Sequence, residues 1–179
     1  EGLIRIQGIP SRELAAKRIF GYVPEIPSMF EALSVREHIE YIRMAYRSSI
    51  TDQEVESLLQ RFEMTDKADK LGGELSKGMM QKVSILCALA VKPQVILFDE
   101  PMVGLDPQAI RELKEVILEL KSQGVTVLIS THMLEMVEEL WDVMFVMEKG
   151  RIKASFRKED VGDRDLDDLF FEVTGGEKR

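Results

Sequence analysis

Short apolar runs alternate with longer amphipathic stretches along most of this chain. The runs at 19–23, 95–98, 125–130 and 143–147 are rich in aliphatic and aromatic residues and are bounded by glycine, proline or charged residues. Such runs are typical of strands. The run at 95–98 contains four consecutive apolar residues, so we expect this strand to be buried on both faces. Strands that alternate with helices predict an α/β fold with a mainly parallel sheet.

Helix start signals mark several segments between these strands. Ser34 and Thr51 are each followed three residues later by a glutamate, which is the capping-box pattern. The helices that they predict make residues 34–74 compositionally distinct, and we interpret this segment as a small helical subdomain inserted between strands. Further helices are expected at 76–91, 107–123 and 134–141, with a short amphipathic helix in the tail at 165–171.

Two acids and a histidine follow two of the predicted strands. Asp99 and Glu100 come after the 95–98 run, and His132 comes after the 125–130 run. Because open parallel sheets bind ligands at the carboxyl ends of their strands, these side chains could share one site. Adjacent acids point to opposite sides, so one could hold a Mg²⁺ shell while the other orients a water. A strand that simply ends at a polar turn, followed by a structural histidine, explains the same residues.

A second candidate site lies at the start of the helix predicted over 76–91. Ser76 and Gly78 stand where unpaired N–H groups and the positive end of the helix dipole suit a phosphate oxygen. Gly78 would also let the backbone approach a ligand closely. Taken alone, an ordinary serine N-cap is the simpler interpretation of this pattern.

Taken together, these motifs resemble those of ABC-type ATPases over nearly the whole chain. Their order and spacing match the Q-loop at 21–25, the signature motif at Leu75, Ser76, Lys77, Gly78 and Met79, the Walker B strand with its glutamate at 95–100, the D-loop at 104–107 and the switch histidine at 130–132. The signature and the closing stretch at 166–174 are more specifically similar to the ATPase subunits of Ecs-type and related bacterial exporters.

The resemblance implies a role for each matching residue. Asp99 would hold Mg²⁺ through water, and Glu25 would contact the metal or its water. Glu100 would polarise the attacking water as general base, and His132 would contact the γ-phosphate of ATP. Asp106 would bridge the two halves of a dimer.

The resemblance also implies partners. The five signature residues would close over the ATP of a second ABC ATPase subunit, since family members work as head-to-tail pairs. The groove between the loop after Glu25 and the helices from Ser34 onward would receive a cytoplasmic helix of a membrane-spanning transporter subunit. The implied protein is an ATP-hydrolysing subunit that couples hydrolysis to transport, with export favoured by the Ecs-type likeness. It would be cytoplasmic and peripheral on the inner face of the cell membrane.

The fold implied is P-loop NTPase-like, with helices flanking the sheet. It would have an α/β core at 1–33 and 75–156, a helical subdomain at 34–74 and a C-terminal helical tail at 157–179. The phosphate loop of that fold, Gly-x-x-x-x-Gly-Lys-Ser/Thr, occurs nowhere in the sequence. In the family it precedes the position where this chain begins. We therefore expect an N-terminally truncated domain that holds half of an ATP site and is inactive alone.

Three positions depart from the family pattern. Glu25 stands where a glutamine is usual, and Lys77 and Met79 replace a glycine and a glutamine of the signature. A carboxylate at position 25 can still bind Mg²⁺, because hard cations accept carboxylate ligands. Lys77 adds positive charge near the phosphates of the partner subunit, whereas Met79 lacks a side-chain amide.

Composition and spacing bear on the alternatives. With 24 Lys and Arg against 32 Asp and Glu, the net charge is −8, so we expect the chain to be a poor non-specific binder of nucleic acid and to have no nucleic-acid partner. The single cysteine, Cys87, cannot form a disulfide within the chain, which fits a reducing compartment.

A soluble, non-transport ABC protein is one alternative. Repair ATPases insert a long coiled coil between Q-loop and signature, but Glu25 and Leu75 are only 50 positions apart.

A degenerate, non-hydrolysing ABC module is the other alternative. The missing phosphate loop favours it, whereas the presence of Asp99, Glu100 and His132 opposes it.

Overall fold

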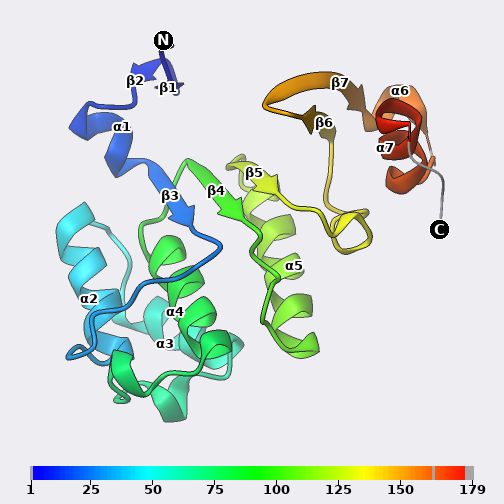
Figure 1. The fold of residues 1–179 in the computed structure, drawn as a ribbon. Helices are drawn as coiled ribbons and strands as arrows, with labels where there is room; N and C mark the ends of the chain where they lie inside the picture. Colours follow the sequence, from blue (N-terminus) through cyan, green and yellow to red (C-terminus); the bar gives the residue numbers. More distant parts are fainter. Residues whose placement is uncertain (1, 163, 176–179) are drawn as a thin grey trace. The chain divides into compact units, whose positions relative to one another are not determined.

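A parallel three-stranded sheet is the centre of the first unit in the computed structural model of this chain, which describes residues 2–162 and 164–175. The chain divides into two compact units, Glu1–Ser130 and Thr131–Arg179, and each is described here by itself. The sheet has the order β3-β4-β5, and its strands are β3 (Phe20–Val23), β4 (Val95–Asp99) and β5 (Thr126–Ser130) (Figure 1).

Two long helices pack against this sheet. Helix α4 (Lys77–Ala90) contacts β3, and helix α5 (Pro107–Ser122) contacts β5. Both begin at a side-chain cap, since Ser76 and Asp106 each accept a hydrogen bond from an amide in the first turn of the helix that follows. These caps satisfy amides that have no partner within the helix. Pro107 occupies the first helical position of α5, where its missing N–H is not needed.

One face of the sheet is buried and the other is partly open. Ile96 and Phe98 have no exposed surface, whereas Leu97 is half-buried between Tyr22 and Leu128, which are 48% and 54% exposed. The expectation that the 95–98 strand is buried on both faces is therefore wrong. Helix α4 packs on the face that carries Ile96, and the row Tyr22–Leu97–Leu128 faces the other way.

Both predicted capping boxes are present in the helical segment between β3 and α4. Ser34 begins α2 (Val35–Tyr46), Thr51 begins α3 (Asp52–Arg61), and in each box the glutamate side chain accepts a hydrogen bond from the cap amide. Two 3₁₀ turns follow, η1 (Thr65–Lys67) and η2 (Gly72–Glu74). The largest fully buried apolar side chains of the first unit come from this segment, from α4 and α5, and from the sheet: Ile39, Leu59, Phe62, Met64, Ile85, Leu86, Ile96, Phe98, Leu113 and Ile117.

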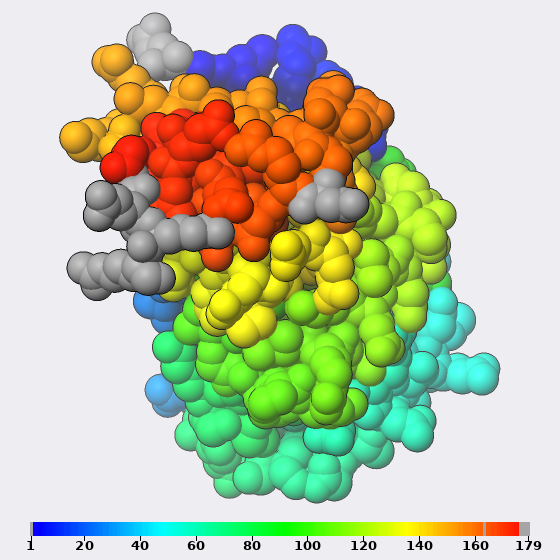
Figure 2. Space-filling model, turned by 90° about the vertical axis from the view of Figure 1, so that its right-hand side faces the viewer, coloured from blue at the N-terminus to red at the C-terminus, as the bar shows by residue number. Residues whose placement is uncertain are grey.

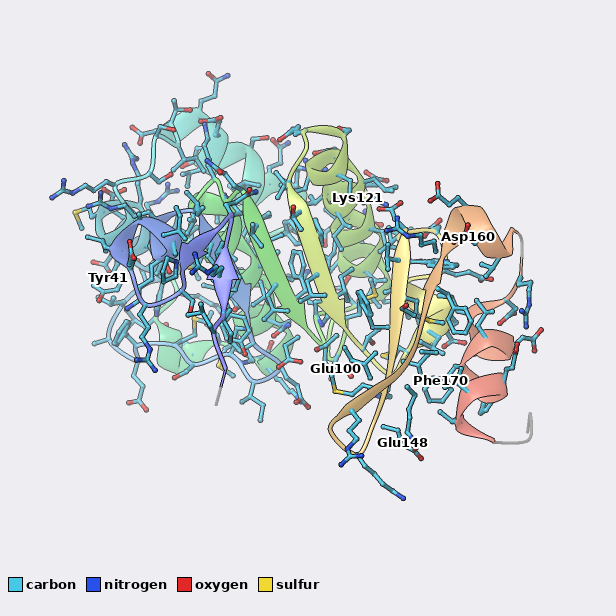
Figure 3. The ribbon with its side chains drawn as sticks, turned by 90° about the horizontal axis from the view of Figure 1, so that it is seen from above. Tyr41, Glu100, Lys121, Glu148, Asp160 and Phe170 are labelled. Atoms are coloured by element: carbon cyan, nitrogen blue, oxygen red, sulfur yellow. The ribbon has the colours of Figure 1, made fainter. Side chains whose placement is uncertain are left out.

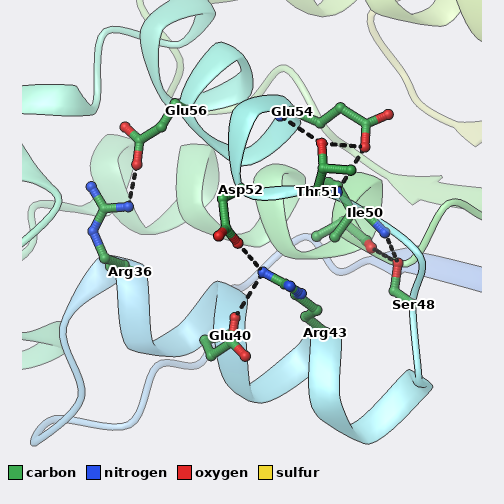
Figure 4. A network of polar contacts seen from close by, with 10 residues as sticks. Arg36, Glu40, Arg43, Ser48, Ile50, Thr51, Asp52, Glu54 and Glu56 are labelled. Atoms are coloured by element: carbon green, nitrogen blue, oxygen red, sulfur yellow. Dashed lines mark hydrogen bonds and ion pairs between the residues drawn. The ribbon is translucent and has the colours of Figure 1, made fainter.

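Ion pairs join α2 to α3 at the surface of the first unit. Arg36 pairs with Glu56, and Arg43 pairs with both Glu40 and Asp52 (Figure 4). Because these groups are largely exposed, each pair contributes little to stability.

A less exposed ion pair joins α3 to α5. The Nε of Arg61 donates to Glu112, and the two terminal nitrogens of Arg61 donate to Glu119 at 2.8 and 2.9 Å. The surfaces of the two helices adjoin in Figure 2. This three-residue cluster connects the helical segment to the helix that packs on the sheet, and its guanidinium lowers the pKa of Glu119.

Substitution of Arg61 by Met is expected to lower the free energy of unfolding by about 1–2 kcal/mol at pH 7, because two charge-assisted contacts to carboxylates are lost. The matched control, Arg43→Met, removes more exposed pairs and is expected to cost about 0.5 kcal/mol or less. The difference in stability between the two variants should shrink as the pH falls below about 4.5, the ordinary pKa of glutamate. Arg61 stabilises only the charged form of Glu119, which is why the pKa of that carboxyl is lowered, and protonation removes this stabilisation. Urea unfolding followed by circular dichroism measures this, and equal effects of the two substitutions would contradict it.

A small hairpin and a short helix precede β3. Strands β1 (Arg5–Ile6) and β2 (Ile9–Pro10) pair antiparallel, and α1 (Leu14–Arg18) follows. Leu3 and Ile4 lie outside the strands and are exposed.

The second unit contains an antiparallel hairpin and short helices. Strands β6 (Val143–Glu148) and β7 (Arg151–Arg157) pair antiparallel, and they are followed by α6 (Lys158–Val161) and α7 (Leu166–Thr174). The single tryptophan, Trp141, belongs to this unit, with the Nζ of Lys158 5.8 Å from its ring centroid. Of the predicted tail at 157–179, residues 163 and 176–179 lie outside the described residues.

The helix predicted over 134–141 is not formed. Only a 3₁₀ turn, η3 (Leu134–Met136), stands there, and turns lead on to β6. Glu135, Glu138 and Glu139 would lie three and four positions apart on one face of an α-helix, where like charges destabilise it.

Candidate functional site

The two predicted acids lie where β4 leaves the sheet. Asp99 is the last residue of β4 and pairs in register with Ser130, the last residue of β5. The hydroxyl of Ser130 donates a hydrogen bond to Asp99 Oδ1, and the Glu100 amide donates to the Ser130 carbonyl at 2.9 Å. The end of β5 therefore holds both the side chain of Asp99 and the backbone of Glu100.

Glu100 has an unusual backbone conformation. Its φ is +46°, in the left-handed region that a non-glycine residue adopts only at a cost of roughly 1–2 kcal/mol. The turn carries the chain away from the sheet directly after Asp99, and Figure 3 labels Glu100 at this point. Asp99 ends the strand and Glu100 begins the turn, and the separate tasks expected of the two acids stay a prediction.

The segment after Glu100 lies against the first turns of α4. Gln81 Nε2 donates to the Pro101 carbonyl at 3.3 Å. Gly78 lies so close to the carbonyl oxygen of Gly104 that a Cβ at position 78 would be 2.7 Å from it. The close approach that we expected Gly78 to allow toward a ligand is thus made, in this structure, toward the loop between β4 and α5.

Asp106 contacts both α5 and α4. Its Oδ1 accepts from the Ala109 amide at 2.8 Å, and its Oδ2 lies 2.8 Å from Lys82 Nζ. Lys82, followed by the Ala109 amide, lowers the pKa of this carboxyl. The predicted dimer role of Asp106 stays a prediction. Lys82 was not singled out from the sequence, although a lysine directly before the mostly apolar stretch 83–90 of a helix was an available signal.

The signature residues divide into buried and exposed positions. Leu75 is buried, whereas Ser76 and Lys77 are exposed and Gly78 and Met79 are half-buried. The Ser76 hydroxyl accepts from the Met79 amide at 3.3 Å, so the serine acts as the cap of α4. This contact matches the simpler interpretation of Ser76 and leaves its nucleotide role a prediction.

Glu25 and His132 are the two remaining predicted residues. Glu25 is exposed in the loop that follows β3, on the sheet edge where β4 also ends. His132 belongs to the second unit. No group of three or more carboxylate, histidine or cysteine side chains that could hold a metal gathers among residues 2–162 and 164–175.

Comparison with known proteins identifies the family of this arrangement. The family model described as ABC transporter matches residues 1–103 of the chain. The chain belongs to this family. The ABC chain is 39% identical over 163 residues to the ABC-type transporter ATP-binding protein EcsA of Bacillus subtilis, an alignment that covers 87% of this chain and 66% of EcsA.

A second relative and a solved structure agree with this assignment. The ABC chain is 32% identical over 179 residues to the Nod factor export ATP-binding protein I of Rhizobium meliloti, covering 98% of this chain and 53% of that protein. It thus spans less than two thirds of the length of EcsA or of the Nod factor protein. A solved structure of an ATP binding subunit of an ABC transporter superimposes with a TM-score of 0.86 at 34% identity, covering 97% of this chain and 77% of the other. The fold is therefore that of an ABC nucleotide-binding domain, which is P-loop NTPase-like.

An aromatic cluster lies on the helical segment of the ABC chain. The His38 ring stacks on Phe30 with 6.0 Å between ring centroids, and the Tyr41 ring meets Phe30 edge-on at 5.6 Å. Phe30 and Tyr41 are about half exposed, whereas His38 is buried. We call Phe30 and Tyr41 the aromatic patch; Tyr41 is labelled in Figure 3.

His38 fixes the loop that carries Phe30. Its Nε2 accepts a hydrogen bond from the Phe30 amide at 2.9 Å, and its Nδ1 lies 2.7 Å from the Ser34 carbonyl, to which it donates. Both ring nitrogens of His38 are therefore occupied by backbone groups, and the exposed position of Phe30 is set by a buried side chain.

The described part of the ABC chain contains no helix with the length and apolar character needed to cross a membrane.

Proposed function

We propose that this chain is part of the ATP-hydrolysing subunit of an ABC transporter. The observation that carries the proposal is the strand end of β4. There the Ser130 hydroxyl donates a hydrogen bond to Asp99, and the next residue, Glu100, has a left-handed backbone conformation. A hydrolytic NTPase needs one acid at the metal and another group that orients the water, and the two positions are suited to these separate tasks.

The residues present fit Mg²⁺ bound together with a nucleotide. In nucleotide sites Mg²⁺ is held through one or two carboxylates plus the substrate phosphates, and not by an all-protein cage. Asp99, hydrogen-bonded by Ser130, would supply one such oxygen, and Glu25 on the same sheet edge would supply a second contact directly or through water. When bound, the ion would neutralise charge that develops on the phosphates.

The other half of the site would come from a second ABC subunit. The N-terminal turn of α4 begins at exposed Ser76, and it would present Ser76, Gly78 and the positive charge of Lys77 to the partner's ATP. His132 would contact the γ-phosphate within its own subunit, and Asp106 would contact the second subunit.

The aromatic patch would receive a cytoplasmic helix of the membrane-spanning subunit. Phe30 and Tyr41 are large, exposed and in mutual contact, which is typical of residues that anchor a protein interface. This contact would place the protein on the inner face of the membrane. The likeness to the Nod factor export ATP-binding protein I supports export as the direction of transport.

The 179-residue chain by itself is expected to bind ATP weakly, with a Kd of about 1 mM or above, because its sequence has no phosphate loop to hold the phosphates. Isothermal titration calorimetry with Mg·ATP measures this. A micromolar Kd would contradict the interpretation of these residues as half of a site.

The proposed function itself is tested by joining the chain to a phosphate loop, which its sequence lacks. The chain fused behind the phosphate-loop segment of a relative such as EcsA is expected to release phosphate from ATP in a Mg²⁺-dependent manner. The matched control is the same fusion with the phosphate-loop lysine replaced by alanine. Turnover no higher than that of the control would contradict the proposal.

A further inference from the structure

Three residues on one face of α4 contact the loop between β4 and α5. Gln81 and Lys82 follow Gly78 by three and four positions, so each lies next to Gly78 on the helix surface. The three residues, in chain order, meet Gly104, Pro101 and Asp106 along the whole length of the loop at 101–106. The loop is therefore fixed to the helix that begins at Ser76.

Two of these contacts are made by buried polar groups. Gln81 is 1% exposed, and its Oε1 has no hydrogen-bond donor among the described residues. The Lys82 side chain is 10% exposed, and its ammonium lies 2.8 Å from Asp106 Oδ2. Burying a polar or charged group costs free energy unless it is paired. The contacts to the loop supply the partners of Lys82 and of Gln81 Nε2.

The Lys82–Asp106 contact also reaches α5. The carboxylate that accepts from Lys82 caps α5 through its other oxygen, at 2.8 Å from the Ala109 amide. One side chain thus joins the signature helix to the helix that follows the loop. At the other end of the loop, Glu100 has a left-handed conformation, and such a conformation persists only where the surroundings fix it.

We propose that Lys82 is a positioning residue that holds the loop at 101–106 on α4, and thereby fixes Glu100 and Asp106 relative to Ser76. This inference rests on the proposed function for its catalytic consequence, but its structural part does not depend on ATP. In the proposed dimer, Ser76 serves the partner's nucleotide and Glu100 serves its own. Lys82 would therefore keep residues of two different ATP sites in one rigid piece.

Amide hydrogen exchange on the 179-residue chain tests the structural part. The reporters are the Val103 and Leu105 amides, which donate within the loop to Glu100 and Met102. Lys82→Met is expected to speed their exchange by about tenfold or more while the Ile39 amide in α2 is unchanged, because the loop opens locally. Lys82→Arg keeps the charge and should restore slow exchange to within about threefold.

The matched control is Lys92→Met, which removes an ion pair to Glu54 elsewhere in the first unit. It should leave the loop amides unchanged. Two outcomes for Lys82→Met would overturn the proposal. Unchanged exchange rates of the loop amides would mean that the Lys82 contact does not hold the loop. Equal acceleration of exchange at Ile39 would mean that the whole unit is loosened. Should Lys82→Met fail to fold, Asp106→Asn carries the same test, because asparagine still caps α5.

The catalytic part is read in the phosphate-loop fusion. There Lys82→Met is expected to lower kcat at least about tenfold with little change in the KM for ATP, and Lys82→Arg should recover most of it. A parallel rise in KM, or no rescue by arginine, would overturn the positioning role. Absence of turnover in the unsubstituted fusion would instead reject the proposed function, and the exchange result would still decide whether Lys82 holds the loop.

Discussion

Replacement of Glu100 by Gln in the phosphate-loop fusion is expected to lower kcat for ATP hydrolysis by about 10²–10⁴-fold, with the affinity for ATP nearly unchanged. A positioned general base contributes an effect of that size, and an amide cannot accept the proton. The substitution keeps the shape of the side chain and leaves the left-handed turn at φ +46° in place. The measurement is steady-state phosphate release together with ATP binding to the same protein.

Glu115→Gln is the matched control for this substitution. Glu115 is exposed on α5 and plays no part in the proposed site, so turnover should stay within about twofold of the unsubstituted fusion. A loss confined to Glu100→Gln supports the base assignment. Unchanged turnover in Glu100→Gln would remove Glu100 from that role and leave Asp99 as the remaining acid at the strand end.

Substitution of Gly72 by Ala is expected to lower the free energy of unfolding by about 1–3 kcal/mol, the usual cost of forcing extra atoms into a packed site. A methyl group at position 72 would overlap the carbonyl oxygen of Phe30 and lie 3.0 Å from its carbonyl carbon. Because these are backbone atoms, the clash can be relieved only by moving the loop that carries Phe30. Gly72 also donates to the Leu33 carbonyl at 2.8 Å, which ties it to the same loop.

The neighbouring glycine provides the control. A Cβ at Gly73 would meet Glu31 at 3.6 Å, which is ordinary van der Waals contact, so Gly73→Ala should change stability by about 0.5 kcal/mol or less. Urea unfolding followed by circular dichroism compares the two variants. Equal stabilities for Gly72→Ala and Gly73→Ala would show that the approach to Phe30 costs nothing to relieve.

Local signals in the sequence predicted the helical elements of the first unit well. The boxes at Ser34 and Thr51 act between residues three positions apart, so a short sequence window contains all the physics that they need. The apolar run before Asp99 likewise predicted β4, although only one of its faces proved fully buried. The positions of Asp99 and Glu100 at the end of β4 could be predicted because they directly follow the apolar run.

Contacts between distant segments could not be predicted in this way. The pairing of Lys82 with Asp106, and that of Arg61 with Glu112 and Glu119, depends on how α3, α4 and α5 pack. No local pattern distinguishes these ion pairs from solvated charges. The helix expected over 134–141 is absent for a local reason, because its glutamates would repel one another on one helix face.

The division at Ser130 and Thr131 determines which spectroscopic probes can follow unfolding. Trp141 is the only tryptophan and lies in the second unit, so its fluorescence reports on that unit. The long helices α2, α3, α4 and α5 all belong to the first unit and dominate the far-ultraviolet dichroism. If the two units unfold separately, a stability obtained from tryptophan emission alone would miss the effects of Arg61, Gly72 and Lys82. Two curves with separate midpoints would mean that one free energy of unfolding does not describe the chain.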